Sequence, residues 1–207
     1  MENNVNNFIF EEKNKAQQNQ VVLNLSEKEK VFYGNIECNG FFESKYKVED
    51  EFKPYLAVAI KKPSDKWLPI FAHETCHMDQ WLEKSPLWLD ADDFKILDSW
   101  LGGTLYPKEK IVNFVHKVIS LEADCERRTI EKIKKYNLPI DIKWYASRAN
   151  AYLYYYQWLI VNRKWYKTAP YEIKDILDLM PEVIKDDSEY FKPLTREMLE
   201  TFNKCRN

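Results

Sequence analysis

The chain has 207 residues, 45% of them apolar, which is enough for one well-filled globular core and short for two. Lysine and arginine number 31 against 33 acidic residues, and a net charge of -2 gives no reason to expect nucleic acid or an anionic membrane as a partner. Four scattered cysteines without CxxC spacing are too few for a disulfide framework. Because the sequence also lacks a signal-peptide pattern and the ~20 consecutive apolar residues of a membrane span, we expect a cytoplasmic protein.

The N-terminal third contains the strand-like patterns. Residues 1–20 are polar and rich in Asn and Gln, which predicts a flexible N-terminal arm. Residues 21–25 and 55–60 read as strands, and residues 30–48 read as a hairpin whose turn is the Asn39-Gly40 pair. Residues 21–207 are expected to form a single domain.

From Pro69 onward the sequence pattern predicts helices rather than strands. Its apolar periodicity and its proline and glycine positions predict helices over residues 69–83, 91–101, 108–136, 142–165, 171–179 and 195–204. This order of elements predicts an α+β fold, with a small antiparallel sheet followed by a mainly helical body.

The stretch "HETCH" places two of the three histidines, His73 and His77, four residues apart. On a helix they lie one turn apart on one face and can present two imidazoles to one metal ion. Glu74 lies about 100° further round the helix, where it reaches a metal-bound water rather than the metal. Two ligands and a general base are what a hydrolytic zinc site uses, and Gln80 is a candidate cleft residue on the same face. The alternative is that both histidines pack in the core.

A zinc site of this kind needs a third protein ligand. His116, the remaining histidine, projects away from the apolar stripe of the helix predicted over 108–136, so we expect it to face solvent. That stripe comprises Ile111, Val115, Val118, Glu122, Cys125 with Glu126, Thr129 and Ile133.

Glu122 and Glu126 interrupt this stripe one turn apart, where uncompensated carboxylates would be costly to bury. Glu122 is therefore the candidate third ligand, and Glu126 would accept a hydrogen bond from a metal-bound histidine. The reverse assignment stays open, as does pairing of both glutamates with Arg127, Arg128 or lysines.

The helix predicted over 142–165 is dense in aromatic residues and supplies candidate hydrogen-bond donors for a reaction oxyanion. Tyr152 and Tyr156 share a face and lead this group, which also includes Arg148 and Tyr155. The alternative is that aromatic residues at helical spacing form core. Cys76 and Cys125 are expected to be small packing residues, with a thiol ligand as the lesser alternative.

These residues resemble the HExxH zincin metallopeptidases, specifically the gluzincin type. In that group a strand precedes the HExxH helix, and a later helix supplies a glutamate ligand followed four residues on by an acidic residue. Here residues 55–60 precede "HETCH", and "LEADCERR" contains Glu122 and Glu126. The family usually has Asp where this chain has Glu126, and the 45 residues from His77 to Glu122 imply an inserted helix and loop over 85–107.

The chain also resembles uncharacterised bacteriophage proteins described only as metallopeptidases, which would place it in a host cytoplasm. The resemblance implies a Zn²⁺-dependent peptidase acting on a peptide or protein substrate. Zinc would be held by His73, His77 and Glu122, with Glu74 as general base. If residues 55–60 form a sheet edge, they would pair with an extended peptide.

Two other function classes remain as alternatives. A zincin-fold module that binds a protein through a purely structural metal would not need the base Glu74. A di-iron helical protein would use residues 74–77 as an ExxH sequence, but it would need a second ExxH, which the chain does not offer beside Glu122.

Overall fold

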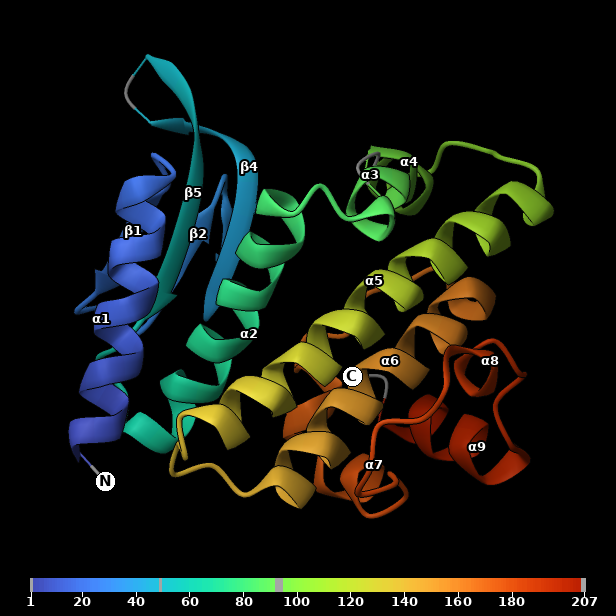
Figure 1. Cartoon of the computed structure of the whole chain (residues 1–207). Helices are drawn as coiled ribbons and strands as arrows, with labels where there is room; N and C mark the ends of the chain where they lie inside the picture. The colour runs from blue at the N-terminus through green and yellow to red at the C-terminus, as the bar shows by residue number, and fades with distance from the viewer. Residues whose placement is uncertain (1, 49, 92–94, 206–207) are drawn as a thin grey trace. The chain divides into compact units, whose positions relative to one another are not determined.

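The computed structural model describes residues 2–48, 50–91 and 95–205 (Figure 1). The chain divides into two compact units, one of Met1–Ser85 with Arg128–Ile140 and one of Pro86–Arg127 with Asp141–Asn207. The first unit holds the described strands, and the described regular structure of the second is helical. A small sheet followed by a mainly helical body confirms the predicted α+β class.

The N-terminal segment is a helix, α1 (Glu2–Gln18), where the sequence predicted a flexible arm. Phe8, Glu12 and Ala16 follow one another at intervals of four and are at most 1% exposed. The Phe8 ring lies 5.4 Å from Phe71 and 5.0 Å from Tyr136, measured between ring centroids. The polar composition therefore misled the prediction, because a single buried stripe is enough to fix a helix whose other faces are solvated.

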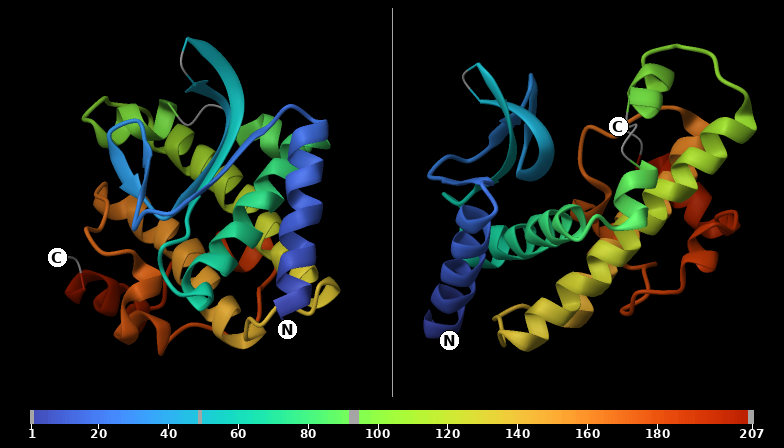
Figure 2. Two further views of the ribbon diagram at one scale, coloured as in Figure 1. Left: turned by 90° about the vertical axis from the view of Figure 1, so that its left-hand side faces the viewer. Right: turned by 45° about the horizontal axis from the view of Figure 1, so that its top comes forward.

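The sheet has three strands in the order β1 (Val22–Ser26), β5 (Glu51–Ala59) and β4 (Gly40–Val48). β1 runs parallel to β5 and β4 runs antiparallel to it, so the sheet is mixed rather than antiparallel as predicted. Figure 2 shows β4 and β5 side by side as two long, curved strands. The predicted strand at 55–60 is confirmed in β5, but β5 is central, and the sheet edges are β1 and β4.

A separate two-stranded hairpin, β2 (Val31–Tyr33) and β3 (Ile36–Cys38), precedes β4. Its turn includes Gly34, whose φ of 59° is in the region that favours glycine, so the prediction of a turn at Asn39-Gly40 was wrong. Gly40 begins β4 instead, and a Cβ there would lie 2.7 Å from Cγ2 of Ile70. The glycine is needed because strand and helix approach closely at this point, not because the chain reverses.

The helix that contains "HETCH" is α2 (Ser64–Leu82), which begins five residues before the predicted start at Pro69. Pro69 lies inside the helix and lacks the N–H that would bond one turn back. Leu68, Phe71 and Ala72 are at most 1% exposed, and burial on both sides of the proline offsets the missing bond. The helix ends before Lys84, whose φ is 53°.

The second unit is built on α5 (Lys108–Lys135) and α6 (Ile142–Asn162), close to the bounds predicted. The last eight residues of α5 belong to the first unit. The other helices are α3 (Pro86–Ala91), α4 (Lys95–Leu101), η1 (Pro170–Glu172), α7 (Lys174–Leu177), α8 (Asp187–Tyr190) and α9 (Arg196–Lys204). Part of the helix predicted over 91–101 lies outside the described residues, at 92–94. None of the described helices has the length and apolar character needed to cross a membrane.

Candidate metal centre

Two histidines face each other on one side of α2. At 100° per residue His77 lies about 40° round the helix from His73, and Gln80 lies about 20° on the other side of His73. The Nε2 atoms of the two histidines are 3.1 Å apart, and their rings are nearly perpendicular. His77 is 8% exposed and His73 is half-buried. This side of α2, with His73, His77 and Gln80, is called the histidine face below.

The separation of the two nitrogens fits a shared metal ion. Zinc in tetrahedral geometry has bonds of about 2.0–2.1 Å to histidine nitrogen, which places two ligand nitrogens about 3.3 Å apart. The measured 3.1 Å between Nε2 of His73 and Nε2 of His77 differs from that value by only about 0.2 Å. The donor set of "HETCH" therefore suits zinc in both chemistry and spacing.

Gln80 contacts the histidine pair from the same helix. Its side chain is fully buried, and its Oε1 lies 2.9 Å from Nδ1 of His77. The sequence placed Gln80 in the cleft, whereas in the structure it lies behind His77 as a hydrogen-bond partner. The signal was available in the sequence, because residues i and i+3 of a helix are neighbours.

Glu74 is 8% exposed and lies on the side of α2 that faces the start of β4. Burial, followed by the negative charge of Glu74, raises the pKa of the Cys38 thiol at the end of β3 to about 11. Gly40 packs against Ile70, and Phe42 of β4 lies 5.8 Å from Trp81 between ring centroids. The edge strand β4 therefore runs beside the histidine face, on the side of α2 that carries Glu74.

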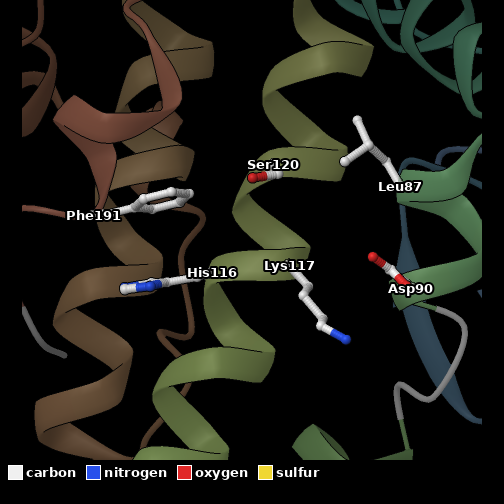
Figure 3. Close-up of a pocket in the computed structure, with 6 residues that line it drawn as sticks. All are labelled: Leu87, Asp90, His116, Lys117, Ser120 and Phe191. Atoms are coloured by element: carbon white, nitrogen blue, oxygen red, sulfur yellow. The ribbon is translucent and has the colours of Figure 1, made fainter.

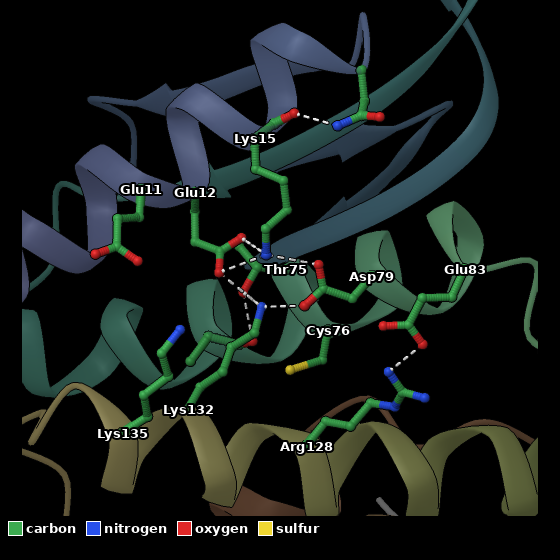
Figure 4. Close-up of polar contacts among 12 residues, drawn as sticks. Glu11, Glu12, Lys15, Thr75, Cys76, Asp79, Glu83, Arg128, Lys132 and Lys135 are labelled. Atoms are coloured by element: carbon green, nitrogen blue, oxygen red, sulfur yellow. Dashed lines mark hydrogen bonds and ion pairs between the residues drawn. The ribbon is translucent and has the colours of Figure 1, made fainter.

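The opposite side of α2 holds a cluster of buried charges (Figure 4). Nζ of Lys132, from the end of α5, lies 2.9 Å from Oγ1 of Thr75, 2.7 Å from Oδ2 of Asp79 and 3.0 Å from Oε1 of Glu12. Lys15 of α1 reaches the other oxygens of Asp79 and Glu12 at 2.9 and 3.0 Å. These contacts fix α2 to α1 and to the last turns of α5, and they leave the histidine face out of the cluster.

The predicted stripe of α5 is confirmed by burial. Glu122 is 8% exposed and Glu126 is 6% exposed. The other six members of the stripe are at most 2% exposed: Ile111, Val115, Val118, Cys125, Thr129 and Ile133. Thr129, in the part of α5 that belongs to the first unit, donates a hydrogen bond to Sγ of Cys76 at 3.4 Å. Cys76 and Cys125 are fully buried.

The two glutamates of α5 lie next to tyrosines of α6 within the second unit. Glu126 accepts a hydrogen bond from the hydroxyl of Tyr145. Of the arginines that the sequence offered as partners, Arg127 pairs with Asp187, and Arg128 pairs with Glu83 at 2.8 Å. Sequence reasoning missed Tyr145.

Tyr152 and Tyr156 are close enough to Glu122 for its charge to act on both of them. Burial is the largest cause that raises the pKa of each hydroxyl, so both stay protonated and able to donate at neutral pH. Their rings pack edge to face with centroids 5.2 Å apart. Tyr145 precedes Tyr152 by seven residues and Tyr156 by eleven, so each of the two lies within about 20° of Tyr145 around the axis of α6. This spacing was the signal in the sequence that pointed to Tyr145.

The other two candidate donors have structural roles. The hydroxyl of Tyr155 donates to the carbonyl of Lys164 and accepts from the backbone N–H of Tyr166. The guanidinium of Arg148 lies 4.6 Å from the centre of the Trp144 ring and 4.8 Å from that of Tyr171. Tyr155 is thus a core residue, as the alternative interpretation held.

His116 is half-buried rather than fully solvent-facing as the sequence predicted. Its ring stacks on Phe191, with centroids 4.4 Å apart and planes at 19°. Figure 3 shows both side chains at a pocket of about 200 Å³, which is also lined by Leu87, Asp90, Lys117 and Ser120. The prediction considered α5 alone, and the segment that covers His116 comes from 75 residues further along the chain.

Comparison with models of known protein families, with curated proteins and with solved structures finds no match for this chain. The geometry of the residues is therefore the basis on which a function is assigned. In the first unit, the structure places His73, His77 and Glu74 beside the edge strand β4. In the second, it places Glu122 beside Tyr152 and Tyr156.

Proposed function

We propose that this chain is a zinc-dependent metallopeptidase with a zincin-like fold. The observation that supports this most directly is the pair of Nε2 atoms of His73 and His77, 3.1 Å apart on a helix that also presents Glu74. At this separation the two imidazoles share a hydrogen bond, and a metal ion held between them would take the place of its proton. A site with two histidines and an adjacent carboxylate is suited to metal-assisted hydrolysis.

The third ligand in this proposal is Glu122 of α5. A catalytic zinc site has three protein ligands, and water or substrate occupies the fourth position. Glu122 is a carboxylate on the buried stripe of α5 and is 8% exposed. Glu126 and Cys125 are the other donors on that stripe, and they are tested beside Glu122 below.

Each residue then has a defined part in peptide hydrolysis. A zinc ion held by His73, His77 and Glu122 would supply a Lewis acid for the scissile carbonyl and for the attacking water. Glu74 takes the proton of the attacking water and passes it to the leaving amine. The hydroxyls of Tyr152 and Tyr156 donate to the oxyanion that develops on the substrate carbonyl.

The substrate class in this proposal is an extended peptide. β4 is an edge strand of the sheet and lies beside the histidine face, at Gly40 and Phe42. A peptide that adds to β4 as a further strand would run past Glu74. The strand named from the sequence for this role, at 55–60, cannot serve, because β5 is paired on both sides.

The test combines zinc analysis with cleavage of a mixed peptide library. Wild-type protein is expected to bind one equivalent of zinc and to cleave a subset of the library. The Glu74→Gln variant is expected to keep its zinc and its fold but to lose about 10²–10⁴-fold in kcat/KM, the usual contribution of a general base. His73→Ala is expected to lose zinc, while His116→Ala, which removes the third histidine, is the matched control and should keep it.

The same experiment separates the other functions. If Glu74→Gln cleaves as fast as the wild type, the mechanism is wrong. Stoichiometric zinc in a protein that cleaves no member of the library would favour a binding module with a structural metal. Two iron ions per chain in place of zinc would favour the di-iron alternative.

Zinc analysis of three α5 variants identifies the third ligand. Glu122→Gln is expected to lose stoichiometric zinc, and Cys125→Ser is expected to retain it. Glu126→Gln is expected to weaken zinc binding about 10–100-fold, as removal of a residue that supports a ligand does. If Glu122→Gln retains zinc and either other variant loses it, that other residue is the ligand.

A further inference from the structure

One buried polar side chain on α2 has no part in the reaction described above. Gln80 is fully buried on the histidine face, and its Oε1 lies 2.9 Å from Nδ1 of His77. An amide is an expensive group to bury unless it is hydrogen-bonded, so an apolar residue would stabilise this position more simply. Its contact with His77 suggests what the amide contributes.

The identity of the two atoms fixes where the proton of His77 lies. Oε1 of Gln80 is a carbonyl oxygen and can only accept, so Nδ1 of His77 must be the donor. A neutral imidazole has one N–H, and Nε2 of His77 is then left with a lone pair. That lone pair points at Nε2 of His73, 3.1 Å away, which is where a shared metal ion would lie.

We propose that Gln80 is a positioning residue that holds His77 in the Nδ1–H tautomer and keeps Nε2 as a preformed metal ligand. The inference rests on the proposed function, because the ion that Nε2 would bind is zinc. Without Gln80 the ring could turn about its χ angles or carry its proton on Nε2, and either change must be reversed before a metal binds. The hydrogen bond therefore lowers the cost of ordering the site.

The geometry also explains why the partner comes from α2 itself. Gln80 follows His77 by three residues, and side chains at this spacing are neighbours on a helix surface. The two residues keep this contact as long as α2 is helical, with no other element required. The histidine face thus contains one ligand together with the group that orients it.

The first test reads the tautomer directly and needs no metal. With only three histidines in the chain, long-range ¹H–¹⁵N spectra of ¹⁵N-histidine-labelled, metal-free protein resolve each ring. His77 is expected to carry its proton on Nδ1 in the wild type and in Gln80→Glu, where a carboxylate oxygen accepts in the same way. In Gln80→Leu this preference is expected to be lost, while the spectrum of His116, in the second unit, stays unchanged.

The second test measures zinc affinity by competition with a chromophoric chelator. Gln80→Leu is expected to bind Zn²⁺ about 10–100-fold more weakly than the wild type, and Gln80→Glu at least as tightly as the wild type. Met78→Ala is the matched control, because it removes a fully buried side chain from another face of α2. It is expected to lower the stability of the fold but to leave both the tautomer and the zinc affinity unchanged.

The outcomes distinguish this inference from the proposed function. A wild-type His77 with its proton on Nε2 overturns the inference whether or not zinc binds, and so does a folded Gln80→Leu variant with wild-type zinc affinity. If Gln80→Leu does not fold, two measurements still test the inference. They are the tautomer of His77 in the wild type and the zinc affinity of Gln80→Glu, and a proton on Nε2 or a weaker affinity would overturn it. A wild type that shows the Nδ1–H tautomer but binds no zinc supports the role of Gln80 and overturns the proposed function instead.

Discussion

The three histidines of this chain occupy different environments, and each environment determines what its imidazole can do. His77 is oriented by a buried amide, and His73 faces it across 3.1 Å. His116 is stacked face to face on Phe191 in the second unit. A ring packed in this way is stabilised by van der Waals contact and loses water from one face, which favours its neutral form.

Acidification is therefore expected to destabilise the fold through His116. Burial lowers the pKa of His116 below its ordinary value of 6.5, so the unfolded chain takes up a proton at a higher pH than the folded chain does. The contribution of His116 to the free energy of unfolding is complete above about pH 6.5 and is lost as the pH falls through the lower pKa of the folded state. Urea denaturation of metal-free protein at pH 7.5 and 5.5 measures this change.

The control for this prediction is His116→Gln, which cannot titrate in that range. Every other titratable group is the same in both proteins, so the difference in unfolding free energy between wild type and variant isolates His116. When the pH falls from 7.5 to 5.5, the wild type should lose more unfolding free energy than His116→Gln does. An equal difference at both pH values would show that His116 does not contribute to acid sensitivity.

At the scale of elements, α2 has two polar faces with opposite tasks. The histidine face presents the proposed ligands, and the other face joins Lys132 to Thr75, Asp79 and Glu12. Lys132 is 11% exposed and Glu12 is 1% exposed, so this is a buried ion cluster rather than a surface pair. Buried clusters of this kind are sensitive to removal of one partner, because the other charges stay in a poorly solvated place.

The Lys132→Met variant is expected to lose about 3–5 kcal/mol of unfolding free energy, since a long apolar chain fills the space but leaves Glu12 and Asp79 with less positive charge nearby. Lys143→Met is the matched control. Its partner is Glu182, and both side chains are more than half exposed, so the expected loss is below about 1 kcal/mol. Urea titrations of both variants measure the effect.

The outcome that would contradict the cluster's role is a Lys132→Met variant as stable as Lys143→Met. A second variant, Lys132→Met with Glu12→Gln, sharpens the comparison. Removing one carboxylate together with the ammonium should recover part of the loss, because fewer charges are left uncompensated.

Sequence periodicity predicted the helical elements well and the sheet poorly. The stripe of α5 from Ile111 to Ile133 is buried as predicted, because burial of one helix face depends on spacing along a single segment. The parallel pairing of β1 with β5 joins residues 33 positions apart, such as Val22 and Tyr55, and spacing within either strand says nothing about it. Gly40 was assigned to a turn for the same reason, since the side chain of Ile70 that excludes a Cβ is 30 residues away.

The candidate site divides in the same way. His73, Glu74 and His77 were found from their spacing in one helix, and Gln80 follows the same rule. Tyr145 shares a face of α6 with Tyr152 and Tyr156, but its hydrogen bond to Glu126 joins two helices, and spacing within α6 does not predict that partner. The burial of α1 was missed too, since Phe8 meets Phe71 and Tyr136 only once the chain has folded.

For the whole molecule, the proposed zinc donors lie far apart in the sequence. His77 and Glu122 are separated by 45 residues, and nothing holds them together in the unfolded chain. Zinc should therefore bind the folded chain in strong preference to the unfolded one. A ligand with that preference raises the free energy of unfolding by RT ln(1 + [L]/Kd).

Removal of the metal is accordingly expected to lower the thermal stability of the whole protein. At a free zinc concentration of about 100 times Kd the gain is about 2.7 kcal/mol, and excess EDTA should abolish it. Melting curves of wild type, His73→Ala, Glu122→Gln and His116→Ala, each with zinc and with EDTA, measure the effect. Wild type and His116→Ala should melt at a higher temperature with zinc, whereas His73→Ala and Glu122→Gln should give the same melting temperature in both solutions. The melting temperature of Glu122→Gln could instead rise with zinc while that of His73→Ala does not. That result would confirm His73 as a zinc ligand and exclude Glu122 as the third ligand.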